Sequence, residues 1–223
     1  MGGALVDNAD WDKSAINNKY VDVKLHRISR PFILTSYDLM RGERVESKVS
    51  AAMKEVAQGV VSQFMNAIKK SGAELMPLSK FDPETCATLS GAFGEDSETD
   101  TLLLSPANYA KIVPTNSLAL NPEVTGTYGI NHIYKSSNMT TAGCEIIALT
   151  ADAVAGAVAT PEIVTAYGSQ GMQYLGEVAG IPMVLISTWD YAKQAVKCSV
   201  ETMAGFAKTD DSKVIGYKIT TSA

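Results

Sequence analysis

The chain has 223 residues, of which 46% are hydrophobic and 19% are charged, so it is long enough to bury a core and is not expected to be disordered. Its 19 basic and 24 acidic side chains give a net charge of -5, which disfavours a protein that coats nucleic acid by neutralising phosphates. The longest apolar runs are far shorter than the ~20 residues of a membrane-spanning helix, and the first residues do not resemble a secretory signal. We therefore expect no membrane contact and synthesis in a cytoplasm-like compartment.

Residues 1–20 are polar and surround a single large apolar side chain, Trp11, which is typical of an arm rather than a core element. Between residues 20 and 34 apolar and polar side chains alternate, with Val21, Val23 and Leu25 on one face. This pattern predicts two strands of an extended hairpin or loop. Pro31 should restrict one of these strands to a sheet edge or a bend, because proline cannot donate a ladder hydrogen bond.

The strongest helical pattern lies in residues 38–71. Ser36 or Asp38 can cap its start, and Ser71 and Gly72 supply its stop. A helix of about 30 residues would be ~45 Å long, whereas a compact domain of this size has a radius of gyration of ~17 Å. The molecule is therefore expected to be elongated and to complete its burial against neighbours. Apolar side chains repeat every three or four residues, at Val45, Val49, Met53, Val56, Val60, Phe64 and Ile68, whereas Lys48, Glu55, Ser62 and Lys69 lie on another face, where substitution of Lys48 or Ser62 by alanine should be mild.

The remaining residues predict a mixture of short strands and helices. Residues 72–100 read as a surface connection with one short helix after Pro83, and Ser105 followed by Pro106 marks a helix start. Thr150 should cap a helix of small residues at 151–158, and Asp210 with Asp211 should form a turn. Strands are expected at 101–104, 129–135, 145–149, 183–187, 195–202 and 214–220, which makes the fold class α+β.

No constellation of residues indicates an enzyme, a cofactor site or a metal site. The three cysteines are far apart and are expected to be reduced, and His26 and His132 have no cysteine nearby, so surface or partner contact is the better interpretation of both. The glycine-rich tetrads at 126–129 and 168–171 lack the lysine of a phosphate loop, and the acidic run at 95–100 lacks the spacing of a calcium loop. We therefore expect no catalytic, cofactor-binding or metal-binding residues.

The order of the elements nevertheless resembles one family. An arm, an alternating segment and one long helix are followed by Leu-Leu-Leu-Ser-Pro-Ala-Asn-Tyr-Ala-Lys-Ile (102–112), Ala-Gly-Cys-Glu-Ile-Ile-Ala-Leu-Thr-Ala-Asp-Ala-Val-Ala-Gly-Ala-Val (142–158) and Val-Glu-Thr-Met-Ala-Gly-Phe-Ala-Lys-Thr-Asp (200–210). In this order and spacing the segments resemble the major capsid protein of tailed double-stranded DNA phages, which has the Hong Kong 97-type fold. The resemblance covers residues 20–220.

The resemblance implies a division of the chain into named parts. Residues 1–20 would be the N-arm, 21–37 the E-loop and 38–71 the spine helix of the peripheral (P) domain. Residues 72–182 would form the axial (A) domain, 183–205 strands of the P domain, and 206–223 strands that return to the A domain. The E-loop would be short, and Lys24 is its candidate for the lysine that some relatives cross-link to asparagine.

The implied function is mechanical. Copies of the chain would form the pentamers and hexamers of an icosahedral head around double-stranded DNA, as part of a virion assembled in the host cytoplasm. The implied partners are other copies, a separate scaffolding protein, a portal and decoration proteins, with DNA enclosed but not bound specifically. The residues that we expect at contacts between subunits are Trp11, His26, Arg27, Arg30, Arg41 and Arg44, because the arginines cluster where neighbouring subunits would meet.

Three other functions remain open from the sequence. An encapsulin-like compartment shares the fold and holds protein instead of DNA, so the nucleic acid content of purified particles would separate the two. A small soluble α+β enzyme would need a catalytic constellation, and none is found. A virion component outside the capsid is the third alternative.

Overall fold

The computed structural model describes residues 21–70, 72–94, 97–112, 129–137, 139, 144–161 and 171–220. Within these ranges the strands form two sheets of five strands each. The elements in chain order are β1 (His26–Thr35), α1 (Ser36–Met40), α2 (Gly42–Ile68), η1 (Gly72–Glu74), β2 (Leu75–Leu78), α3 (Pro83–Leu89), β3 (Thr101–Leu104), α4 (Pro106–Ile112), β4 (His132–Lys135), β5 (Ile146–Leu149), β6 (Val154–Ala159), β7 (Gly171–Val178), β8 (Ile181–Asp190), β9 (Ala195–Lys208), η3 (Asp211–Lys213) and β10 (Val214–Ile219).

The first sheet is antiparallel and packs against α2. Its order is β1-β9-β8-β7, and β6 pairs with the second half of β9. The core between this sheet and the helix contains Ala52, Val56 and Val60 of α2 together with Met183 and Val200 of the sheet. The apolar stripe predicted for the long helix is therefore confirmed at Val56 and Val60, which are buried in this core.

The second sheet has the order β2-β10-β5-β3-β4 and is covered on both faces. On one face Ile146 and Ala148 of β5 pack in a cluster with residues of α3 and α4. On the other face Ile147 and Leu149 pack in a cluster with the last turns of α2. A strand buried on both sides needs an unbroken apolar run, which is what residues 146–149 supply.

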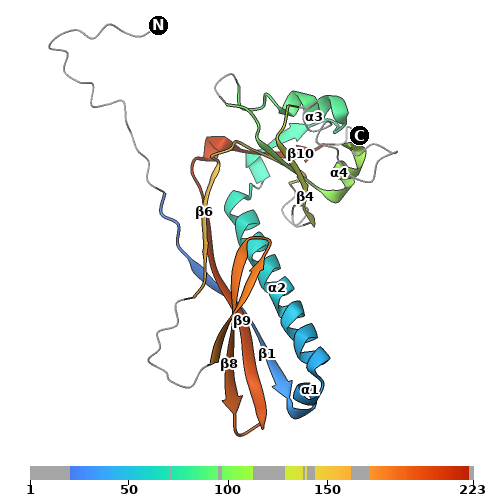
Figure 1. Cartoon of the computed structure of the whole chain (residues 1–223). Coiled ribbons are helices and arrows are strands. Elements are labelled where there is room, and N and C mark those ends of the chain that lie inside the picture. The colour runs from blue at the N-terminus through green and yellow to red at the C-terminus, as the bar shows by residue number, and fades with distance from the viewer. Residues whose placement is uncertain are drawn as a thin grey trace, which may run out of the picture.

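Helix α2 connects the two sheets and gives the molecule its length. It has 27 residues and is therefore ~40 Å long. Its first part covers the first sheet and its end enters the core of the second, and Figure 1 places the two sheets toward opposite ends of the helix. The expectation of an elongated subunit is confirmed.

The predicted single helix at 38–71 is wrong at both ends. The backbone leaves the helical region at Arg41 (φ -114°, ψ 88°), which separates α1 from α2, and α2 ends at Ile68. The cap of α1 is Thr35, whose hydroxyl accepts the N–H of Asp38 while the Asp38 carboxylate accepts the N–H of Thr35. This reciprocal capping box fixes the start of α1 at Ser36.

The hairpin expected at residues 20–34 is also wrong. Residues 21–25 have no strand assignment, and β1 is one continuous strand that pairs with β9 along all ten of its residues. The long partner strand β9 holds residues 26–35 in one continuous strand. Pro31 does lie on an edge strand, as predicted, because nothing in the described ranges pairs with the other side of β1.

The helix predicted at 151–158 is a turn followed by strand β6. Pairing with β9 replaces the helical hydrogen bonds, and Gly156 is needed there because a Cβ at this position would lie 2.5 Å from the Phe206 ring. Both β6 and β7 belong to the first sheet. They lie in the segment 72–182, which was expected to form a domain together with the strands of the second sheet.

Strands β2 and β7 were not anticipated. The helices at Pro83 and Pro106, the strand at Thr101 and the turn at Asp210 are confirmed.

Candidate subunit-contact residues

The structure describes five of the six predicted contact residues, which are spread along β1 and into the start of α2, and Trp11 lies outside the described residues. His26 is the exposed first residue of β1, and Arg27 and Arg30 follow it on the same strand. Arg41 stands at the break between α1 and α2, and Arg44 lies in the first turn of α2. The arginines thus border the edge strand of the first sheet and the adjoining helix start.

Arg27 forms a two-pronged ion pair with Glu201 of β9. Its Nε and one terminal nitrogen each donate to a different carboxylate oxygen at 2.6 Å, and these bonds raise the pKa of the guanidinium above its usual value. The Glu201 side chain is only 3% exposed, whereas Arg27 is more than half exposed. Arg27 was expected to contact a neighbouring subunit, but its partner here is a buried carboxylate of its own chain.

Replacing Arg27 by leucine is expected to cost about 2 kcal/mol of unfolding free energy, because Glu201 would remain buried without a counterion while part of the loss is screened by solvent. The control is Arg30→Leu on the same strand. Arg30 pairs with Glu55 of α2 at 2.6 Å, but both side chains are about half exposed, so this loss should stay below ~1 kcal/mol. Urea denaturation measures both, and equal costs would contradict the assignment of Glu201 as a buried ion.

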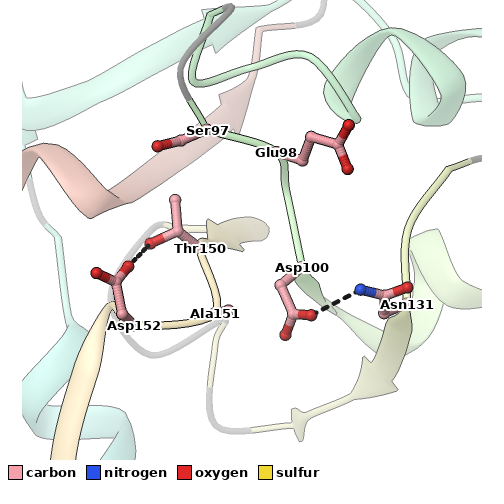
Figure 2. Close-up of a pocket in the computed structure, with 7 residues that line it drawn as sticks. All are labelled: Ser97, Glu98, Asp100, Asn131, Thr150, Ala151 and Asp152. Carbon is pink, nitrogen blue, oxygen red and sulfur yellow. Dashed lines mark hydrogen bonds between the residues drawn. The ribbon is translucent and has the colours of Figure 1, made fainter. Parts of the chain in front are cut away.

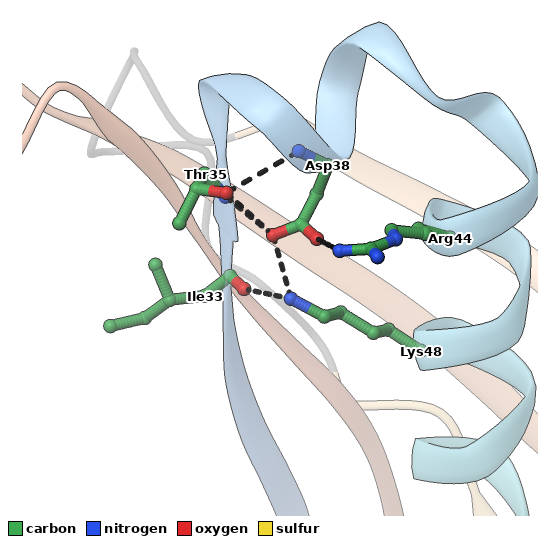
Figure 3. Close-up of polar contacts among 5 residues, drawn as sticks. All are labelled: Ile33, Thr35, Asp38, Arg44 and Lys48. Atoms are coloured by element: carbon green, nitrogen blue, oxygen red, sulfur yellow. Dashed lines mark hydrogen bonds and ion pairs between the residues drawn. The ribbon is translucent and has the colours of Figure 1, made fainter.

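Asp38 is the centre of a second group of polar contacts (Figure 3). Its carboxylate accepts from the Lys48 ammonium at 2.7 Å and from the N–H and hydroxyl of Thr35, and the Arg44 guanidinium lies 3.9 Å away. The hydrogen bond from Lys48, followed by those from Thr35, holds the pKa of Asp38 well below its usual range. The carboxylate is therefore ionised at neutral pH and ties β1, α1 and α2 together.

The Lys48 side chain lies off the apolar stripe, as expected, but it makes polar contacts that the sequence did not indicate. Besides Asp38, its ammonium donates to the main-chain carbonyl of Ile33 at 3.1 Å. We now expect Lys48→Ala to lower the melting temperature clearly more than Lys54→Ala, which removes an exposed lysine from the same helix. Thermal unfolding followed by circular dichroism makes the comparison, and similar melting temperatures would mean that the Asp38 contacts contribute nothing to stability.

The outer edge of β1 is protected from further strand pairing over its last residues, 31–35. Backbone groups of alternate residues point to the same edge of a strand, so Pro31, Ile33 and Thr35 present theirs together. Pro31 has no N–H, the Ile33 carbonyl is bonded to Lys48 and the Thr35 N–H is bonded to Asp38. These are the devices by which natural sheets protect an edge from uncontrolled pairing.

Arg41 and Arg44 both lie over the ring of Tyr37, at 5.2 and 4.8 Å from its centre to their guanidinium carbons. Arg44 also approaches Asp38, whereas Arg41 has no carboxylate partner among the described residues. Of the four predicted arginines, Arg41 therefore keeps the most capacity for a partner outside its own chain.

An acid-lined pocket lies at the second sheet, where β5 leads into the turn before β6 (Figure 2). It is a hollow of about 330 Å³ lined by three carboxylates, of which Asp100 and Asp152 have hydrogen-bond partners. Asp100 accepts from Asn131 at 2.9 Å and Asp152 accepts from Lys213 and Thr150, and these hydrogen bonds lower the pKa of both. The described residues contain no group of three or more histidine, cysteine or acidic side chains arranged to hold a metal ion.

The three cysteines are free and buried. Burial raises the pKa of the Cys86 thiol to about 11 and raises those of Cys144 and Cys198 as well. A thiol with a raised pKa is a poor nucleophile at neutral pH, so these residues serve packing.

Among the described helices none is long and apolar enough to cross a membrane.

No protein-family model and no curated protein matches the sequence. Solved structures do match. A virus-like particle from Pyrococcus furiosus aligns with 90% of this chain and 78% of its own (TM-score 0.57, 16% identity), and the capsid of Myoviridae phage XM1 aligns with 89% and 74% (TM-score 0.56, 9% identity). A chain from Mycobacterium phage Adephagia aligns with 99% and 84% (TM-score 0.53, 12% identity). The chain therefore has the Hong Kong 97-type capsid fold that its sequence resembled.

Proposed function

We propose that this chain is the structural subunit of a closed protein shell, namely the major capsid protein of a tailed phage. The observation that carries the proposal is the likeness of its fold to subunits of a phage capsid and of a virus-like particle. The likeness covers about nine tenths of the chain. The proposed role is mechanical and includes no catalysis.

The form of the subunit supports this role. A helix that extends from one sheet core into another makes a stiff, elongated tile, and large apolar side chains stay exposed in several of its elements. In a monomer such surface has no use, whereas in a shell neighbouring tiles cover it.

Within the proposal, α2 and the first sheet are the P domain and the second sheet with α3 and α4 is the A domain. The A domains would meet in pentamers and hexamers, and the N-arm (1–20) and the E-loop segment (21–37) would contact neighbouring subunits. The exposed His26 and Arg41 would take part in such contacts. A scaffolding protein, a portal and decoration proteins would join the shell, and the virion would be its final location.

An encapsulin-like compartment is the second candidate, and the likeness to the Pyrococcus furiosus particle favours it. Purified protein viewed by negative-stain electron microscopy tests both. Closed shells are expected, and a chain that stays monomeric across concentration and salt would overturn the proposal. Nuclease-protected double-stranded DNA in particles from infected or induced cells would identify a phage head, and protein cargo without DNA would identify the compartment.

Unassembled subunits are expected to bind duplex DNA only in the non-specific range of ~10⁻⁴ to 10⁻⁶ M at physiological salt. The reason is the net charge of -5 and the engagement of Arg27, Arg30 and Arg44 with carboxylates of their own chain. A gel-shift titration makes the measurement. Nanomolar, sequence-dependent binding would contradict a passive container wall.

A further inference from the structure

We infer that a group of ion pairs between the two sheets sets the orientation of one sheet relative to the other, and that this orientation varies when the ion pairs are released. The polar clamp, as we call this group, consists of residues 150–153, residues 209–213 and the side chains of Lys70 and Lys208. The inference concerns the form of a single subunit and goes beyond the proposed function.

The described elements cross between the two sheets three times. Helix α2 makes the first crossing, residues 150–153 connect β5 to β6, and residues 209–213 connect β9 to β10. Leu149 of β5 lies opposite Val214 of β10. Val154 of β6 lies opposite Lys208 of β9. The last two crossings therefore leave one sheet as neighbours and enter the other sheet as neighbours.

These two neighbouring crossings are bonded along their length. Thr209 donates its N–H to the Ala153 carbonyl at 3.0 Å and its hydroxyl to the Asp152 carbonyl at 2.5 Å. At the other end, Thr150 donates its N–H to the Lys213 carbonyl at 3.3 Å. Between these bonds the Lys213 ammonium pairs with the Asp152 carboxylate, which also accepts from the Thr150 hydroxyl (Figure 2). The crossings thus form one ribbon instead of two independent linkers.

Lys70 attaches the end of α2 to this ribbon. It follows the helix by two residues, and only 8% of it is exposed. Its ammonium donates to the main-chain carbonyl and to the carboxylate of Asp211, each at 3.3 Å, and Lys208 pairs with the same carboxylate at 2.6 Å. Hydrogen bonds from Lys208 and Lys70 lower the pKa of Asp211, so the carboxylate is ionised at neutral pH. Asp211 therefore joins the end of α2 to the end of β9.

Elsewhere between the sheets, space is left open. A hollow of about 520 Å³ lies between Ala179 and Ile181 of the first sheet and residues 135–137 of the second, and α2 also lines it. Helix α2 enters both cores, but a long helix can curve gently and so does not fix the angle alone. The polar clamp is therefore the contact that holds this angle.

The polar clamp is built so that salt can weaken it. The side chains of Asp152 and Asp211 are 68% and 75% exposed, and ion pairs in such surroundings are screened by dissolved ions. Lys70 differs, because a buried ammonium that loses its acceptor is costly. In a shell, the angle between the sheets would set how one tile meets the next, and this consequence alone rests on the proposed function.

The distance between a spin label on each sheet measures the orientation. Met76→Cys in β2 and Met172→Cys in β7 provide half-exposed positions in the second and first sheet, and the native cysteines are buried. Labelled chain is diluted with unlabelled parent chain, so that double electron–electron resonance records distances within one chain. We expect a narrow distance distribution at ~0.05 M salt and one about twice as wide at ~1 M salt, where the Debye length is ~3 Å.

Substitution of Lys70 supplies the second readout. Lys70→Met keeps the length of the side chain and removes its charge, so the distribution should already be about twice as wide at low salt. The matched control is Lys80→Met. Lys80 pairs with Asp82 at 2.7 Å, away from the crossings, and its loss should leave the distribution of the parent chain unchanged.

A charge reversal keeps the test decisive if Lys70→Met does not fold. Asp152→Lys places two lysines together in the ribbon and should widen the distribution, whereas Asp152→Lys combined with Lys213→Asp restores an ion pair and should narrow it again. If Lys70→Met and Asp152→Lys both keep the narrow distribution, the inference fails whether or not the parent chain forms shells. If the labels respond as expected and the parent chain never forms shells, the inference stands and the proposed function fails.

Discussion

Replacing Val56 by aspartate is expected to destabilise the subunit by about 4 kcal/mol or more, a large part of the 5–15 kcal/mol that keeps a typical domain folded. Val56 is 1% exposed and packs between α2 and the first sheet with Met183 and Val200. A carboxylate there would have no partner and no water. Urea denaturation of the purified variant gives the free energy, and insoluble expression would point the same way.

The matched control is Val61→Asp, the same exchange on the same helix at a position that is about half exposed. It should change stability by ~0.5 kcal/mol or less. Phe64→Asp, at a partly buried position in contact with Phe206, should fall between the two. If Val56→Asp and Val61→Asp were tolerated equally, the buried face of α2 would be assigned wrongly.

Deleting residues 1–19 is expected to leave a folded subunit that assembles poorly. These residues lie outside the described ranges, and the prediction comes from their composition: Trp11 is the one large apolar side chain in a polar segment. A lone aromatic in such a segment contributes chiefly as an anchor in a pocket of a partner. Thermal unfolding should be nearly unchanged, whereas electron microscopy should reveal few closed shells.

The full-length Trp11→Ala variant separates the anchor from the length of the arm. If Trp11 is the anchor, this single change should reproduce most of the assembly defect of the deletion. Normal shells from the deletion variant, at the yield of the parent chain, would show that the arm has no role in assembly.

The long helix was predictable because its signal is local. Val56, Val60 and Ile68 recur at the helical period, and that spacing buries one face wherever the helix packs. The start of α1 was also within reach, since Thr35 followed three residues later by Asp38 is the pattern of a capping box. Ser36 and Asp38 are themselves of the residue types that cap helices, and this placed the predicted start beyond Thr35.

Strand β6 was beyond local reasoning. Alanines and a glycine at 151–158 are compatible with a helix or a strand, and the choice was made by the free side of β9, some 50 residues further along the chain. The same holds for β1, which needed a partner strand of matching length to remain straight through Pro31. Pairing of distant strands overrides weak local preference because each residue in the ladder gains hydrogen bonds and packing that the local preference cannot supply.

For the contact residues, the sequence by itself determined that four arginines cluster between residues 27 and 44, and that no catalytic or metal-binding pattern accompanies them. Only the tertiary structure decided their partners. Glu201 is 174 positions away from Arg27, and Lys48 reaches Asp38 only because α2 turns back along β1. Side-chain charge is a property of the residue, whereas an ion pair depends on which distant backbone lies within a few ångströms, and that is fixed by the packing of the whole chain.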